Sequence, residues 1–276
     1  MPRLALWRTI AASFAFTFGD RSRFTRLAWP WLAVSVIVGF VTLGTASGRA
    51  AMALRVALYI AAFVGFGLAW CRAILSDEDR AWYAPPRLEL RALRFLCYAL
   101  LIAMAMVLPF CALFSLFAWK IVPIMAQWGL QQTLGAALGV LALVLAIGWA
   151  FIARLLPALA AIAADVEGDV LAQAWMLGRG QWPRLIAGPL LCAAPFELLQ
   201  IIFDAIPNAG SFAIVSFNLG AVTLYWHHAI GLALILEFAI YLVELAVVMA
   251  FIAFTYHQLA TARPVDDPLL LTLVAK

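Results

Sequence analysis

The chain has 276 residues, of which 67% are hydrophobic and 12% are charged, with a formal net charge of +4 and a mean hydropathy of +1.03. Soluble domains are about half apolar and about a quarter charged, so a water-soluble fold of this length could not bury so much apolar surface. The composition therefore excludes a soluble globular protein, and the small net charge argues against a nucleic-acid-binding one.

The apolar residues occur in long uninterrupted runs without strand-like alternation. In lipid, backbone polar groups must be satisfied within helices or a closed barrel, and runs of this kind favour helices. We therefore predict an all-α fold, a polytopic membrane helix bundle with interfacial amphipathic helices on its cytoplasmic side.

Six stretches have about the 20 apolar residues that a helix needs to cross the hydrocarbon layer. The predicted spans are 27–46, 53–74, 95–119, 136–160, 184–206 and 229–258. They define a transmembrane domain over 27–260, between a cytoplasmic interfacial helix in 1–26 and a cytoplasmic tail at 261–276. Prolines fall within the third span (Pro109) and the fifth (Pro189 and Pro195), and the fifth should be interrupted there. The sixth span is long enough that it must tilt or project from the bilayer.

The segment 207–228 leaves the span count open. It is moderately apolar but rich in Gly, Ser and Asn, which indicates an outer loop or a shallow re-entrant segment. A seventh span here is the alternative, and it would place the carboxyl terminus outside.

The basic residues indicate the orientation independently. Of the 18 Lys and Arg residues, 15 fall on one side of the six predicted spans. Positive charge is retained in the cytoplasm, so both termini and the connections at 75–94 and 161–183 are expected inside, in a bacterial inner membrane. The three on the other side are Arg49, Arg55 and Lys120.

The first 26 residues do not have the pattern of a cleaved signal peptide. The apolar stretch at 27–46 is too long for a signal peptide's apolar core, although small residues follow it. The preceding segment 3–19 instead places Trp7, Phe14 and Phe18 on one helical face with Ile10, while Arg8, Thr9 and Ser13 lie away from that face. This pattern predicts a helix lying in the membrane interface.

The connection between the fourth and fifth spans predicts a short amphipathic elbow over 168–182. Asp169 can cap a helix at 170–177, and Gly178 and Gly180 can end it. Trp175 and Trp182 are placed for the membrane interface.

This stretch carries a resemblance. It reads Arg-x-x-Pro-Ala, an acidic break, then Ala-Trp-x-x-Gly-x-Gly-x-Trp and an Arg-led span. The pattern is similar to one in a bacterial family comprising the membrane domains of some glycerophosphodiester phosphodiesterases and their stand-alone relatives. The matching residues are Arg154, Pro157, Ala158, Asp165, Ala174, Trp175, Gly178, Gly180 and Trp182. The closing segment 251–260 also resembles the family's end, and the rest matches in topology only. The resemblance implies a multi-helix membrane unit, and it implies no catalysis because the soluble phosphodiesterase domain has no counterpart here.

Metal and thiol chemistry find little support in the sequence. The four cysteines have no metal-ligand spacing and are interpreted as small buried apolar residues. His227 and His228 could ligate a metal, but adjacent histidines point in different directions on a helix, and interfacial hydrogen bonding accounts for them better. No metal and no cofactor is expected.

Four acids lie within the last two predicted spans and are the residues most suggestive of function. Glu197 and Asp204 are seven residues apart in the fifth span, and Glu237 and Glu244 are seven apart in the sixth, so each pair shares a helix face. A charge at the bilayer centre costs at least about 2.5 kcal/mol, so each acid needs a partner, a cavity or a proton. One interpretation is protonated acids bonded to Gln200, Tyr241 or carbonyls, and the other is a route for a proton or cation.

Cationic partners for these acids are scarce in the sequence. Arg154, at the inner end of the fourth span, and Arg184, which opens the fifth, are candidates for pairing or for fixing topology. Two functions remain open: a non-catalytic scaffold or accessory protein, which we favour, and a transporter of a small solute or lipid. An enzyme acting on lipid headgroups is disfavoured by the missing motifs. The expected partners are membrane lipids and a membrane protein or a second copy, with no nucleic acid.

Overall fold

The structure is a computed structural model that describes residues 4–44, 48–76, 90–120, 139, 148–149, 152–166, 168–205, 214–219 and 222–261. Apart from one two-stranded hairpin, its regular elements are helices. They are α1 (Leu6–Gly19), α2 (Arg21–Gly44), α3 (Gly48–Leu75), α4 (Leu90–Lys120), the helix Ile152–Ala163, α7 (Val170–Leu177), α8 (Trp182–Ala205) and α9 (His228–Thr261).

Within this described part, four helices are long and apolar enough to cross a membrane. These candidate spans are Arg21–Val41, Ala50–Leu75, Trp182–Ile201 and Ile235–Thr261. They coincide with the first, second, fifth and sixth predicted spans. The fifth is not broken at its prolines, because α8 runs as one helix through Pro189 and Pro195.

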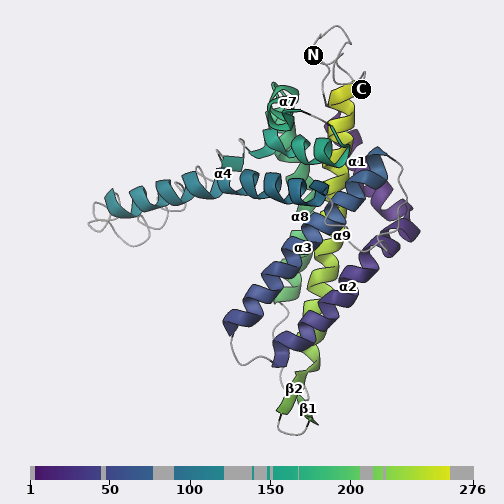
Figure 1. Cartoon of the computed structure of the whole chain (residues 1–276), viewed down its shortest axis with the longest axis vertical. Helices are drawn as coiled ribbons and strands as arrows, with labels where there is room; N and C mark the ends of the chain where they lie inside the picture. The colour runs from purple at the N-terminus through teal and green to yellow at the C-terminus, as the bar shows by residue number, and fades with distance from the viewer. Residues whose placement is uncertain are drawn as a thin grey trace.

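The third and fourth predicted spans have different outcomes. A helix, α4, covers the predicted 95–119, but Figure 1 shows it projecting sideways from α2, α3, α8 and α9 instead of running alongside them. Most of the predicted 136–160 lies outside the described residues, and its end forms the helix Ile152–Ala163.

A short hairpin lies in the segment that was expected to be an outer loop or re-entrant. Strands β1 (Ile214–Leu219) and β2 (Val222–His227) pair antiparallel, with Leu219 opposite Val222. Their sequences, IVSFNL and VTLYWH, are rich in the β-branched and aromatic residues that favour strands. Figure 1 places this hairpin at the opposite end of the bundle from α7.

Helix α9 is the central element of the bundle. It contacts α1, α2, α3, α7 and α8, and half of its span-length segment is buried. Between α9 and its neighbours lies an aromatic cluster around Trp70, whose side chain is 0% exposed. Trp70 stacks on Phe66 at 5.7 Å between ring centroids and meets the edges of Phe16 at 5.4 Å and Phe24 at 5.8 Å. Because lipid is as apolar as these side chains, close packing and not the hydrophobic effect holds the helices together.

Two glycines allow the helices to approach closely. A Cβ at Gly65 would overlap the indole of Trp31, and one at Gly188 would overlap the ring of Phe251. These two glycines are therefore helix-packing residues.

Helix α1 turns its small polar residues toward the protein. Thr9, Ser13 and Thr17 are buried against the bundle, and the Thr9 hydroxyl donates to Oε1 of Gln258 in α9 at 3.2 Å. The sequence placed Thr9 and Ser13 away from the apolar face, but both are buried together with Ile10 of that face, whereas Trp7 is 72% exposed. Small hydroxyl side chains let two helices pack closely and can bond to their own backbone, as Ser13 does to the Thr9 carbonyl at 2.7 Å.

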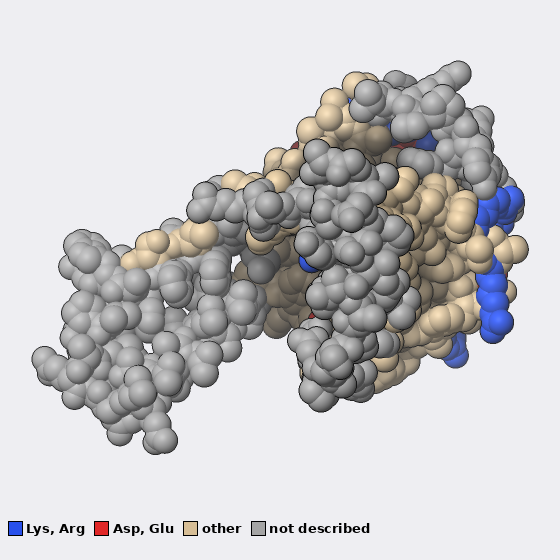
Figure 2. Space-filling model, turned by 90° about the horizontal axis from the view of Figure 1, so that it is seen from below, with Lys and Arg blue, Asp and Glu red and all other residues tan. Residues whose placement is uncertain are grey.

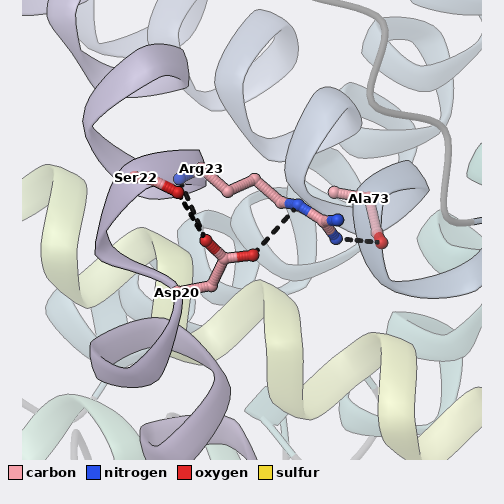
Figure 3. A network of polar contacts seen from close by, with 4 residues as sticks. All are labelled: Asp20, Ser22, Arg23 and Ala73. Atoms are coloured by element: carbon pink, nitrogen blue, oxygen red, sulfur yellow. Dashed lines mark hydrogen bonds and ion pairs between the residues drawn. The ribbon is translucent and has the colours of Figure 1, made fainter.

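A charged corner joins α1, α2 and α3 (Figure 3). Asp20 caps α2, accepting from the backbone N–H of Arg23 at 3.1 Å and pairing with the Arg23 Nε at 3.2 Å. Nη1 of Arg23 donates to the carbonyl of Ala73 at 3.1 Å, and so satisfies a backbone group in the last turn of α3. The Arg23 backbone N–H, followed by Ser22 and nearby positive charge, holds the pKa of the Asp20 carboxyl below its ordinary value.

Candidate functional site

Three of the predicted acids belong to a set of polar side chains on α3, α8 and α9. On α3, the Tyr59 hydroxyl donates to Oε1 of Glu237 at 3.0 Å. One helical turn after Glu237, Tyr241 donates to the Tyr59 carbonyl at 3.2 Å, and the two tyrosine rings lie 4.6 Å apart. Glu237 is thus held by a phenol from the neighbouring helix and is exposed on its other side.

Glu197 and Glu244 lie on two helices that contact each other, α8 and α9. Glu244 of α9 is partly buried, and the charge of Glu197 of α8 acts on it repulsively. Tyr241 also feels the charge of Glu244, which connects this pair to Tyr59 and Glu237. The side chain of Asp204, the fourth predicted acid, lies outside the described residues.

Arg55 lies one turn before Tyr59 on α3. Its Nε is buried and has no hydrogen-bond partner among the described residues, and its charge acts on Tyr59. We call the resulting set the polar track; its members are Arg55, Tyr59, Glu197, Glu237, Tyr241 and Glu244. It could bind a cation at its carboxylates or pass a proton between neighbouring phenol and carboxyl groups.

The sequence missed Tyr59 and the placement of Arg55. Tyr241 was expected to bond an acid, but nothing in the local pattern of α3 distinguishes Tyr59 from an interfacial tyrosine. The available signal was the spacing of four residues between Arg55 and Tyr59, because residues four apart lie on the same face of a helix.

The two predicted pairing arginines are found elsewhere. The Arg154 guanidinium lies over the ring of Trp175 at 4.9 Å, joining the helix Ile152–Ala163 to α7. Nη1 of Arg184 donates to the Leu4 carbonyl at 2.8 Å and lies 3.4 Å from Oε1 of Gln181. Both arginines therefore contact the elbow region and not the polar track.

The elbow has the local structure that the sequence predicts. Asp169 caps α7 by accepting from the backbone N–H of Ala172 at 3.1 Å, and Gly178 follows its last residue. Gly178 has little free space, since a Cβ there would lie 3.3 Å from the Arg154 Cα, and Gly180 has a φ of +77°. Trp175 and Trp182 are both exposed.

The helix before the elbow ends in an unusual way. Asp165 adopts a left-handed φ of 58°, and the two hydrogen bonds that close this helix end run from Asp165 to Ile162 and from Val166 to Ala161. Glycine is the usual residue at this position, and aspartate tolerates it at some cost. The Asp165 carboxylate then pairs with Nε of Arg91 at 2.8 Å, which fixes the start of α4 against the elbow.

Cysteine and metal predictions have mixed outcomes. Cys71 and Cys192 are buried as predicted, but Cys97 and Cys111 on α4 are exposed, because much of α4 lies away from the other helices. Among the described residues, no group of three or more His, Cys, Asp or Glu side chains gathers to hold a metal ion. The side chains of His227 and His228 lie outside the described residues.

The predicted site residues thus divide between two places in the fold, the polar track and the elbow with its contacts to α1 and α4. Comparisons with protein-family models, with curated proteins and with solved structures found no match. The resemblance to the membrane domains of glycerophosphodiester phosphodiesterases therefore stays a prediction.

Proposed function

We propose that this chain is a multi-pass protein of the bacterial inner membrane that acts without catalysis, as a scaffold or accessory protein for a membrane-protein partner or a second copy. Six spans with both termini in the cytoplasm are part of this proposal. The helices long and apolar enough to cross a membrane support the location.

The packing around α9 is the observation that carries the scaffold proposal. The volume between α2, α3 and α9 is filled by large aromatic side chains, among them Trp31, Phe66, Trp70 and Phe238. Close approach at Gly65 and Gly188 locks neighbouring helices against this core. A filled core with close helix contacts resists the rocking motions by which transporters alternate their access.

Exposed apolar positions on α2 and α4 offer the test of partner binding. A photo-crosslinking residue placed in living cells at Ile37 or at Leu100, both exposed, should give a discrete protein product at one or both positions. The same residue at Phe66, which is buried, is the matched control and should give no product with another chain. Crosslinks to lipid alone at both exposed positions would contradict the scaffold proposal.

The polar track favours transport as the second candidate function. The Tyr59 hydroxyl donates to Glu237, and the charge of Glu197 acts on Glu244. Titratable groups of α3, α8 and α9 therefore influence one another. Such a chain of groups within membrane-spanning helices is typical of proton-coupled pathways.

Proton flux separates the two functions. In proteoliposomes containing a pH-sensitive dye, a scaffold should dissipate an imposed proton gradient no faster than protein-free vesicles. A transporter should dissipate it faster, and the double variant Glu197→Gln with Glu244→Gln should remove the excess rate. Asp20→Asn is the matched control, because Asp20 lies at the start of α2 and outside the polar track. Flux that depends on Glu197 and Glu244 would replace the scaffold proposal with the transport one.

A further inference from the structure

The chain just before α1 is held by the start of α8 through both its backbone and its side chain. The Leu4 backbone N–H donates to Oε1 of Gln181 at 3.3 Å, and the Leu4 carbonyl accepts from Nη1 of Arg184 at 2.8 Å. Gln181 is 6% exposed. The Leu4 side chain is 3% exposed and belongs to a buried cluster with Leu185 and Phe251. We call Gln181 and Arg184 the clamp.

Between the clamp and α2, the main neighbour of α1 is α9. The two helices meet along a line of small polar side chains that we call the seam. Its members are Thr9, Ser13 and Thr17 on α1 and Thr255 and Gln258 on α9. Thr255 lies three residues before Gln258 and so shares its helix face. At its other end α1 is joined to α2 by one residue, Asp20.

Two hydroxyls of the seam are buried without a hydrogen bond. Thr17 is 3% exposed and Thr255 is 1% exposed, and neither Oγ1 has a partner in the part of the chain that the structure describes. Thr9 and Ser13, in contrast, each donate to the carbonyl four residues earlier. A buried hydroxyl without a partner has lost its hydrogen bonds to water, so closing the seam carries a cost that opening relieves.

The clamp therefore contributes the stronger contact that keeps α1 in place. The bond from Arg184 to the Leu4 carbonyl is charge-assisted, and such bonds are about twice as strong as those between neutral groups. The seam has a single printed side-chain bond between α1 and α9, from Thr9 to Gln258 at 3.2 Å. Loss of the clamp should thus free α1 before any other helix of the bundle.

The outer face of α1 keeps the helix at the membrane when the seam opens. Trp7 is 72% exposed and Phe18 is 48% exposed, and a helix with such an apolar face is retained in the membrane interface when basic side chains flank it. Figure 2 shows Lys and Arg side chains gathered along the same side of the molecule as α1 and the start of α2 in Figure 1. Opening therefore uncovers α9 without moving α1 into water.

We propose that α1 is a detachable cover for the inner end of α9, held closed by the clamp on Leu4. The cover opens as a unit, with Asp20 as the joint, while the other helices stay folded. Opening uncovers the face of α9 that carries Thr255 and Gln258. This device is independent of the proposed function, because it operates whether the bundle is a scaffold or a transporter.

Hydrogen–deuterium exchange of the full chain in neutral detergent, followed by mass spectrometry, tests the proposal. Arg184→Ala removes the charged donor to Leu4, so the amides of α1 should exchange about tenfold faster, while those of α3 keep their wild-type rates. Leu4→Ala removes the buried side chain and should also accelerate exchange in α1. Arg184→Lys keeps a charged donor and should give a rate between those of Arg184→Ala and the wild type.

The matched control is Arg179→Ala. Arg179 is exposed and lies outside the clamp, five residues before Arg184, so this variant loses the same charge from the same region of the chain. Its α1 amides should exchange at the wild-type rate.

Substitutions in the seam should act in the opposite direction. Thr17→Val and Thr255→Val each replace an unpartnered buried hydroxyl by a methyl group, and valine and threonine have similar helix propensities. Each variant should slow exchange in α1 several-fold. Thr261→Val is the control, because the Thr261 hydroxyl is exposed and bonds to the His257 carbonyl, and it should leave exchange in α1 unchanged.

Four results would overturn the proposal. One is unchanged exchange in α1 of an Arg184→Ala variant whose helical circular dichroism is intact. Another is equal acceleration by Arg179→Ala. The third is equal acceleration of α1 and α3, which would show that α1 opens only when the whole bundle unfolds. The fourth is faster exchange in both valine variants, which would show that the two hydroxyls stabilise the closed seam.

Discussion

Asp20 and Arg23 show how single charged residues join helix ends in a chain with very few charges. The Asp20 carboxylate replaces a missing backbone acceptor at the start of α2, and Arg23 replaces a missing donor at the end of α3. Each group thus satisfies a backbone atom that would otherwise depend on water at the membrane edge. The Asp20–Arg23 pair is partly exposed, so its own attraction contributes less than about 1 kcal/mol.

Replacing Asp20 by Asn should destabilise the protein in a pH-dependent manner. The folded-state pKa of Asp20 lies below its ordinary value of 3.8, so the carboxylate stabilises the fold above that pH, and this contribution is lost as pH falls through the folded pKa. Thermal unfolding in detergent should show a lower midpoint for Asp20→Asn than for wild type near neutral pH. The two midpoints should converge as the pH falls below the folded-state pKa of Asp20.

Asp20→Ala provides the comparison. It removes the helix cap as well as the charge, so it should cost about 1 kcal/mol more than Asp20→Asn at neutral pH. A difference between wild type and Asp20→Asn that grows as pH falls would contradict the assignment of the cap.

Local residue patterns were predictable, whereas contacts between distant segments were not. Asp169, Gly178 and the helix 170–177 follow from capping rules that involve only a few neighbouring residues. The burial of Thr9 against Gln258 depends on two segments 249 residues apart, which no local pattern specifies. Hydrophobic periodicity identified the two faces of α1 but could not say which one meets protein and which meets lipid.

At the scale of helices, the bundle depends on how closely α8 and α9 approach. Phe251 of α9 lies against the backbone of α8 at Gly188, where any side chain would intrude. Pro189 comes directly after this glycine, and a helix with a proline lacks one backbone hydrogen bond, so packing against α9 has to keep this part of α8 in place.

Gly188→Ala should therefore destabilise the protein by about 1–3 kcal/mol, the usual cost of overpacking. The matched control is Gly39→Ala on α2, where an added Cβ meets no atom within 4 Å. That change should be neutral or stabilising by up to about 1 kcal/mol, because alanine favours a helix. Unfolding midpoints in detergent measure both.

A second substitution tests the cause. Phe251→Leu in the Gly188→Ala background should recover part of the lost stability, since it removes the ring that the new methyl group meets. A Gly188→Ala variant as stable as Gly39→Ala would show that helix preference, and not the contact with Phe251, decides the effect.

Across the whole molecule, helix identity was predicted better than helix direction. Apolar run length located α2, α3, α8 and α9 and a helix at α4, because each must satisfy its backbone internally in lipid. The sideways course of α4 could not be predicted, since it depends on contacts between distant segments, such as the pair of Arg91 at its start with Asp165, which lies over 70 residues away. The hairpin was missed because its residues are as apolar as those of a short helix.

Reporter fusions should show both termini on the cytoplasmic side. Helix α1 and the carboxyl end of α9 lie at one end of the bundle, and the β1–β2 hairpin lies at the other (Figure 1). A fluorescent protein fused after residue 276 should therefore fluoresce, because it folds in the cytoplasm. Alkaline phosphatase inserted between Leu219 and Val222 should be active, because it folds only outside. The reverse pattern would show that the orientation is the opposite of the proposed one. If a seventh span is present, the carboxyl-terminal fusion should not fluoresce.

The contact between α1 and α9 sets an order for biosynthesis. Thr9 and its partner Gln258 are 249 residues apart, so Gln258 leaves the ribosome long after Thr9. The hydroxyl-bearing face of α1 must therefore wait, uncovered by its main neighbour, until α9 has been synthesised. A ribosome that stops before α9 would release a chain in which this polar face stays uncovered. The contact between α1 and α9 would then distinguish a chain that contains α9 from one truncated before it.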